Sequence, residues 1–246
     1  MTKVLLTRPE QECQALQQLL AADNIEAMCQ PLFAIIPGRQ LSSLAEQLAV
    51  ADIVIAVSKH AVSMASRQLN QQWPSHIRCF AVGQATQQAW QQAGVEAIAP
   101  QLETSEGLLA LPQLANVAEQ RIVILRGQRG RELLAEQLHQ RGADVSYCEC
   151  YQREAITLNS SQLVPYWQQQ ISYLIITSGE QLNRLQALCD ESQLPWLYSN
   201  TLITVSQRLA DLARTMGFKQ ILVSASANNQ ALKATLLTAM NKAKSR

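Results

Sequence analysis

The 246-residue sequence has no long hydrophobic run and few charged residues. Apolar residues make up 48% and charged residues 16%, which is the balance of a globular protein and excludes a disordered or fibrous chain. Because no run reaches the roughly 18 apolar residues that a spanning helix needs, we expect no membrane segment. The opening MTKVLLTRPE predicts a short strand and not a signal-peptide core, so we expect a cytoplasmic protein.

Strong charge of either sign and metal-binding cysteine motifs are also missing. Twenty Lys and Arg balance nineteen Asp and Glu, for a net charge of +1, so neutralising a nucleic-acid backbone is not the expected function. The six cysteines form no CxxC pair and no zinc-type pattern with histidine, so we expect no metal site. Cys148 and Cys150 should share one face of a strand as buried, reduced thiols in a reducing cytosol.

Several catalytic and nucleotide-binding motifs are absent as well. The sequence has no GxGxxG, no GxxxxGK[ST] and no GxSxG. These absences argue against dinucleotide binding, P-loop nucleotide binding and the α/β-hydrolase mechanism. Only three histidines are present, and none pairs with an evident nucleophile. Of these, only His60 lies beside a predicted strand end.

The sequence contains the same plan twice. In the first pair of segments, each segment has an apolar strand, an arginine (Arg8 or Arg126), a helix, a turn and a second strand. The two segments are KVLLTRPEQECQALQQLLAADNIEAMCQP and RIVILRGQRGRELLAEQLHQRGADVSYCE. Two further pairs of segments each share an apolar strand that leads into a helix. One pair is ADIVIAVSKHAVSMASRQL and SYLIITSGEQLNRLQAL, and the other is RCFAVGQATQQAWQQAGVEAIA and TLITVSQRLADLARTMGFKQILV. The separation grows from 118 residues between Arg8 and Arg126 to 123 between Gly83 and Ser206, as small loop insertions would cause.

The alternation of short apolar runs with helices predicts parallel strands that are covered on both faces. Such strands are joined by right-handed crossovers. We therefore predict an α/β fold of two flavodoxin-like parallel-sheet domains, related by internal duplication.

In sheets of this kind a ligand binds beyond the carboxyl ends of the strands, where loops lead into helices. Small hydroxyl residues, glycines and cations at these points would present donors to an anion, aided by the helix dipoles. For each serine or threonine, simple helix capping is the alternative interpretation, but their recurrence in both halves favours a ligand. The strand ends lack the acidic residues that hold a divalent ion in receiver domains. The candidate binding residues are Arg8, Ser58, Lys59, Gly83, Arg126, Gly127, Arg129, Thr177, Ser178, Gly179 and Ser206.

Five segments together resemble the uroporphyrinogen-III synthase family. They are LLTRPE, VGQATQQAWQQAG, ILRGQRGRELLAEQLHQRGADVSYCECYQRE, ITSGEQL and TVSQRLADLARTMGF. The resemblance runs along nearly the whole chain, and LLTRP and YCECYQRE with its preceding helix are its most specific parts. It implies an enzyme of tetrapyrrole biosynthesis that cyclises linear hydroxymethylbilane with loss of water. The last pyrrole ring is inverted through a spirocyclic pyrrolenine to give uroporphyrinogen III, without cofactor or metal.

The resemblance also implies a domain arrangement. Residues 1–34 and 156–246 would form one discontinuous domain, and residues 38–152 the other. Residues 32–37 and 150–156 would be the crossing strands of a two-stranded connection. We expect the two domains to move about these strands, because two thin connections leave domain motion as the default. We take the chain to be a monomer.

Two residues gain a role only through the resemblance. Tyr151 aligns with a tyrosine that is thought to donate a hydrogen bond to the departing hydroxyl, although a half-buried strand tyrosine is the alternative interpretation. Thr86 falls where the family has a hydroxyl that faces substrate. In the second half Leu209 stands where a threonine would be expected, so only Ser206 is a possible substitute. The substrate carries eight carboxylates, for which Arg131 and Arg208 are further candidate partners.

One alternative of another class remains open. A cytosolic two-lobed protein that binds an anionic metabolite without transforming it would use the same architecture. If the protein is an enzyme, the preceding enzyme of the pathway could hand over the unstable substrate in a transient contact. We expect neither nucleic acid nor membrane as a partner.

Overall fold

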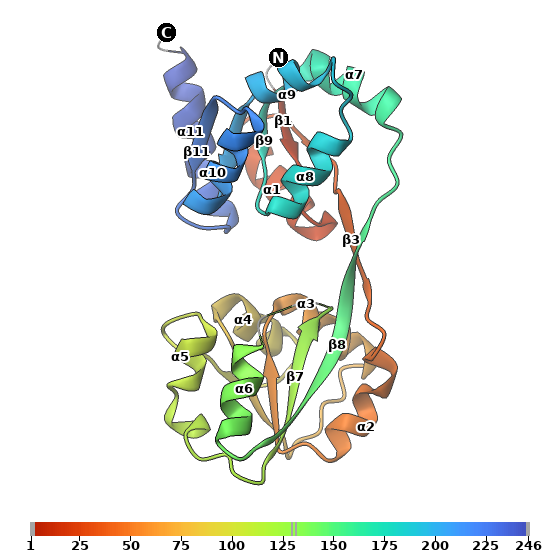
Figure 1. The fold of residues 1–246 in the computed structure, drawn as a ribbon, viewed down its shortest axis with the longest axis vertical. Helices are drawn as coiled ribbons and strands as arrows, with labels where there is room; N and C mark the ends of the chain where they lie inside the picture. Colours follow the sequence, from red (N-terminus) through yellow and green to blue (C-terminus); the bar gives the residue numbers. More distant parts are fainter. Residues whose placement is uncertain (1–2, 129, 131, 245–246) are drawn as a thin grey trace. The chain divides into compact units, whose positions relative to one another are not determined.

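The structure is a computed structural model that describes residues 3–128, 130 and 132–244. The chain divides into two compact units, which consist of Met1–Ala34 with Glu154–Arg246 and of Ile35–Arg153. Each unit is built around a sheet with helices on both faces (Figure 1). Among the described residues, no helix combines the length and the apolar character needed to cross a membrane.

The sheet of the first unit has five strands in the order β11-β10-β9-β1-β2. Each neighbouring pair is parallel. In chain order within the unit this arrangement reads 2-1-3-4-5, which is the flavodoxin order. The strands are β1 (Lys3–Leu6), β2 (Ala27–Cys29), β9 (Ile171–Ile175), β10 (Thr201–Thr204) and β11 (Gln220–Val223).

Two helix layers enclose this sheet because successive strand residues point to opposite faces. Val4 and Leu6 pack with the layer of α1 and α11, whereas Leu5 packs with the layer of α7, α8, α9 and α10. The strands are therefore apolar on both faces, as the sequence pattern predicted. The helices are α1 (Glu10–Ala21), α7 (Ser160–Gln170), α8 (Gly179–Ala187), α9 (Leu194–Ser199), α10 (Gln207–Met216) and α11 (Asn229–Lys244).

The sheet of the second unit has the strand order β3-β8-β7-β4-β5-β6. Its five strands from β8 to β6 are paired in parallel. They repeat the order of the first sheet, with β7 and β8 in the places of β1 and β2. The strands are β3 (Phe33–Pro37), β4 (Ile53–Ala56), β5 (Arg78–Ala81), β6 (Ala97–Ile98), β7 (Arg121–Gly127) and β8 (Asp144–Ala155).

The second sheet is also covered on both faces. Val54 and Val123 pack with α2, α3 and α4 on one side, and Ile55 and Ile124 pack with α5 and α6 on the other. Figure 1 shows the helices on either side of this sheet. The helical segments are η1 (Leu41–Ser43), α2 (Leu44–Ala49), α3 (Lys59–Gln68), α4 (Gln84–Gln92), α5 (Ser105–Leu109), η2 (Pro112–Leu114) and α6 (Leu133–Gln140).

The turns that end corresponding helices have the same backbone conformation in both units. Asn24, Gly94, Gly142 and Gly217 have φ values of 57°, 73°, 83° and 118°. Glycine and asparagine tolerate this left-handed region better than other residues. These helices therefore end in turns, as the repeated strand-helix-turn-strand plan of the sequence predicted.

The thiol pair predicted on β8 is confirmed. The side chains of Cys148 and Cys150 are both fully buried, and their sulfur atoms lie 3.7 Å apart. All six cysteines are free. The hydrogen bond from Cys150 to Cys148, together with burial, raises the pKa of the Cys150 thiol.

β3 and the second half of β8 run side by side as the two chain segments that join the units. The Gly38 amide donates to the Cys150 carbonyl (2.9 Å), and the Ile156 amide donates to the Leu32 carbonyl (3.1 Å). Because residue numbers rise along one segment as they fall along the other, the two are antiparallel. A Cβ atom at position 38 would lie 1.9 Å from the Glu149 carbonyl oxygen, so this close approach requires glycine.

Gly38→Ala should destabilise the protein. The added methyl group collides with backbone that cannot rotate away, and such overpacking costs roughly 1–3 kcal/mol of unfolding free energy. Urea denaturation followed by circular dichroism would measure the loss. Gly130→Ala is the matched control, because its nearest neighbours would be side-chain atoms 3.8 Å away. Equal midpoints for the two variants would contradict the prediction.

Candidate functional site

Tyr151 and Ser58 meet at the carboxyl ends of the second unit's strands. Ser58 follows β4 and caps α3, since its Oγ accepts from the Ala61 amide at 3.2 Å. The same hydroxyl donates to the Tyr151 phenol oxygen at 3.2 Å. The Tyr151 ring is 8% exposed and stands edge-on to the His60 ring, with centroids 5.6 Å apart.

An irregularity in the β7–β8 pairing positions Tyr151. Arg126 lies opposite Glu149, but the next residue, Gly127, lies opposite Tyr151. The extra residue on β8 is a bulge, which changes the direction of the side chain that follows it. A Cβ atom at Gly127 would lie 2.8 Å from the Tyr151 ring, so glycine leaves the space that the phenol fills.

A second cluster surrounds Arg126 at the end of β7. Its guanidinium donates to Glu132 Oε1 at 2.9 Å and lies 4.2 Å from the centre of the Tyr147 ring. The Tyr147 hydroxyl donates to Glu132 Oε2 at 2.5 Å. The hydrogen bonds from Tyr147 and then Arg126 lower the pKa of Glu132. Burial, followed by the contact with Glu132, raises the pKa of Tyr147 to about 12.

The Gly83 turn, at the end of β5, also holds a carboxylate of the chain itself. Glu103 Oε2 accepts from the Gln84 amide, at the start of α4, at 3.1 Å. A Cβ atom on Gly83 would lie 2.3 Å from that oxygen. Thr86, in the first turn of α4, is 6% exposed. Lys59 is half-buried at the start of α3.

In the first unit the candidate residues lie at the corresponding strand ends. Arg8 donates to Asn229 Oδ1 at 2.6 Å, and burial lowers the pKa of its guanidinium. The amide and the hydroxyl of Thr177 both donate to Gln181 Oε1, at 2.9 and 3.2 Å. Ser178 caps α8, which begins at Gly179. Ser206 caps α10.

The structure thus sorts the predicted residues into local groups. Tyr151 bonds to Ser58 and lies against Gly127, while Arg126 belongs to the neighbouring cluster with Glu132. The capping role that the sequence left as an alternative applies to Ser58, Ser178 and Ser206, whose hydroxyls accept backbone N–H groups. Arg208 is exposed on α10. Arg129 and Arg131 lie outside the described residues.

Sequence reasoning missed the partners of the candidate cations. Glu132 and Tyr147 hold Arg126, and Asn229 holds Arg8. Glu132 lies within the RGRELL segment, so its closeness to Arg126 along the chain was a usable signal. No local pattern links Asn229 to Arg8, because 221 residues separate them.

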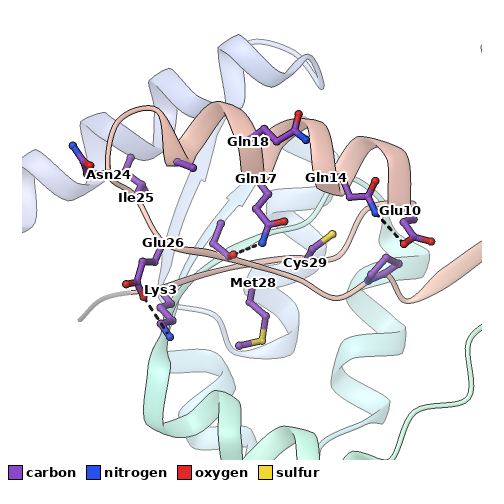
Figure 2. Close-up of a pocket in the computed structure, with 13 residues that line it drawn as sticks. Lys3, Glu10, Gln14, Gln17, Gln18, Asn24, Ile25, Glu26, Met28 and Cys29 are labelled. Carbon is purple, nitrogen blue, oxygen red and sulfur yellow. Dashed lines mark hydrogen bonds and ion pairs between the residues drawn. The ribbon is translucent and has the colours of Figure 1, made fainter.

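A hollow of about 1110 Å³ lies elsewhere in the first unit, along α1 and the edge strand β2 (Figure 2). Figure 2 shows Gln17 reaching from α1 to the edge of β2, where its side chain donates to the Ala27 carbonyl at 2.7 Å. At one end Lys3 pairs with Glu26 at 3.3 Å. None of the predicted site residues lines this hollow, so it is separate from the strand-end groups.

Comparison with known proteins identifies the family. The family model described as uroporphyrinogen-III synthase HemD matches residues 14–234. The chain belongs to the uroporphyrinogen-III synthase family. The uroporphyrinogen-III synthase of Escherichia coli strain K12 is 41% identical over 239 residues, which covers 93% of this chain and 97% of that protein. The Salmonella typhimurium protein of the same name is 42% identical with the same coverage. The family predicted from the sequence segments is therefore confirmed.

Solved structures of the family share the fold. The uroporphyrinogen-III synthetase of Helicobacter pylori aligns with a TM-score of 0.65 at 14% identity, over 97% of this chain and 100% of that one. A mutant uroporphyrinogen III synthase from Thermus thermophilus aligns with a TM-score of 0.61 at 16% identity, over the full length of both chains. At such identities the likeness concerns the fold, and it confirms the predicted α/β class.

Tyr147→Phe should raise the pKa of Glu132, because it removes the largest cause of the lowered value. A carboxyl group with a lowered folded-state pKa stabilises the protein above its unfolded pKa, and the contribution disappears as the pH falls through the folded value. The variant should therefore lose more stability at pH 7 than at pH 3. Carbon-13 NMR titration of the Glu132 carboxyl would test this, and an unchanged titration midpoint would contradict it.

Proposed function

We propose that this protein cyclises hydroxymethylbilane to uroporphyrinogen III in tetrapyrrole biosynthesis. The observation that carries the proposal is the 41% identity to the Escherichia coli uroporphyrinogen-III synthase, which extends over 97% of that enzyme. A relationship of this extent favours catalysis over metabolite sensing.

Tyr151 is the proposed proton donor to the departing hydroxyl. The Ala61 amide donates to Ser58, and the Ser58 hydroxyl donates to the phenol oxygen. Because the phenol oxygen accepts this bond, its own proton remains available for a ligand. Hydrogen bonds in such a chain polarise one another, which strengthens the terminal donor. A neutral phenol can therefore assist the loss of water at neutral pH.

The carboxylates of the substrate are proposed to bind at the strand ends of the two units. Arginine forms bidentate hydrogen bonds with carboxylates, and helix N-termini add backbone donors and a favourable dipole. Distributed donors suit a flexible polyanion, because catalysis here depends on holding one folded geometry of the linear tetrapyrrole. The proposed binding residues are Arg8, Ser58, Lys59, Gly83, Thr86, Arg126, Gly127, Arg129, Thr177, Ser178, Gly179 and Ser206.

The proposal also covers the protein's location, its oligomeric state, its need for a cofactor and the delivery of its substrate. Following the family resemblance, we propose a cytoplasmic monomer that needs no cofactor. We further propose that its unstable substrate arrives by transient hand-over from the preceding enzyme of the pathway. We also propose that the two units move relative to each other about β3 and β8.

The purified protein should direct product formation to the type III isomer. Hydroxymethylbilane would be generated enzymatically, and the oxidised porphyrins separated by chromatography. A synthase produces type III, whereas a binding protein leaves the type I ring that forms spontaneously. Heat-denatured protein serves as the control, and type I product alone from the folded protein would refute the proposed function.

Tyr151→Phe should lower the rate of type III formation by roughly 10- to 100-fold, which lies at or below the lower limit of the contribution typical of one positioned proton donor. Single-turnover kinetics would measure the chemical step directly. Tyr166→Phe is the matched control, because it removes a phenol that is 44% exposed on α7. Unchanged turnover in Tyr151→Phe would remove this residue from the mechanism.

A further inference from the structure

Arg126 is already paired with a carboxylate of its own chain. Its side chain is 9% exposed, whereas that of Glu132 is 53% exposed. The guanidinium is held between the Tyr147 ring, the Gly127 carbonyl, which accepts from Nε at 3.3 Å, and the Glu132 carboxylate at 2.9 Å. The exposed member of this cluster is therefore the carboxylate that caps the enclosed cation.

Glu132 occupies the position that a ligand carboxylate at Arg126 would need. Both carboxylates carry one negative charge, so a ligand carboxylate that accepts from the Nη1 donor of Arg126 competes with Glu132 for it. A buried cation without a partner is costly, and Glu132 supplies that partner when no ligand is bound. Glu132 is the N-cap residue of α6 and lies directly before the first residue of the helix.

We propose that Glu132 is a positioning residue that competes with the substrate for Arg126. Its carboxylate orients the guanidinium in the free protein and is exchanged for a substrate carboxylate on binding. The inference rests on the proposed function, which it deepens by making the substrate KM depend on an internal anion. In the free protein Glu132 balances the charge of Arg126, and in the complex a substrate carboxylate does so. Because only an anionic group can replace Glu132 in this role, the exchange selects for anionic substrate groups.

Glu132→Gln is the decisive variant because it retains the shape and the hydrogen-bonding capacity of the side chain. The amide oxygen can accept from Arg126, and the amide nitrogen can donate to the Tyr147 oxygen. Only the competing charge is lost. We expect the KM for hydroxymethylbilane to fall by about threefold to tenfold, as expected when a charge-assisted pair is weakened. The kcat for type III product should change by less than about twofold, since binding and not proton transfer is altered.

Glu136→Gln, which makes the same charge change on the exposed side of α6, is the matched control and should leave KM unaltered. The inhibition constant for added uroporphyrinogen III, which carries the same carboxylates, should fall in Glu132→Gln in proportion to KM. In an Arg126→Met background the effect of Glu132→Gln on KM should disappear. This double variant separates competition at Arg126 from a general change in surface charge.

Several outcomes would overturn the inference. An unchanged or raised KM in Glu132→Gln would show that the carboxylate does not compete. A joint fall of kcat and of the melting temperature would show that Glu132 is a structural clamp. The proposed function fails separately, because its failure appears as type I product from the wild-type protein, whereas failure of the inference leaves wild-type type III formation intact.

Discussion

The parallel pairing of β7 with β8 positions both side-chain clusters of the second unit. The pairing places Arg126 at the end of one strand, and the bulge after it brings Tyr151 opposite Gly127. Tyr151 then reaches the Ser58 hydroxyl at the end of the adjacent strand β4. A regular register would turn the residue at position 151 to the other face of the sheet, because side chains alternate along a strand. The one inserted residue therefore allows the Tyr151 phenol to bond to Ser58, the residue that caps α3.

Electrostatics explains why the candidate cations have internal partners. Arg8 and Arg126 are largely enclosed, and enclosing a guanidinium is costly unless hydrogen-bond acceptors surround it. Asn229 supplies a neutral acceptor to Arg8, whereas Glu132 supplies a charged one to Arg126. The negative charge of Glu12 also acts on Arg8, so a carboxylate contributes to the surroundings of both guanidinium groups. The two arginines, which correspond in the duplicated sequence, therefore differ in the acceptor that each bonds to directly.

The two units share their strand order, but the corresponding strands come at different points along the chain. In the first unit β1 and β2 come at the start of the chain, and in the second unit the equivalent β7 and β8 come last. β8 also pairs with β3, the edge strand of its sheet, whereas the short β2 is itself the edge strand of the first sheet. The helix caps recur at Ser58, Ser178 and Ser206, because each parallel strand that leads into a helix leaves the same N-terminal amides to satisfy.

The sequence by itself determined the α/β class, the repeated strand-helix plan with a turn after the helix, and the buried thiol pair. These features follow from local periodicity and backbone preference, which act over a few residues. The tertiary structure alone decided which acceptor each arginine meets, that a glutamate caps the Gly83 turn, and that the phenol at position 151 meets Ser58. These contacts join residues 6 to 221 positions apart. Their geometry depends on strand register and packing, which a local pattern does not specify.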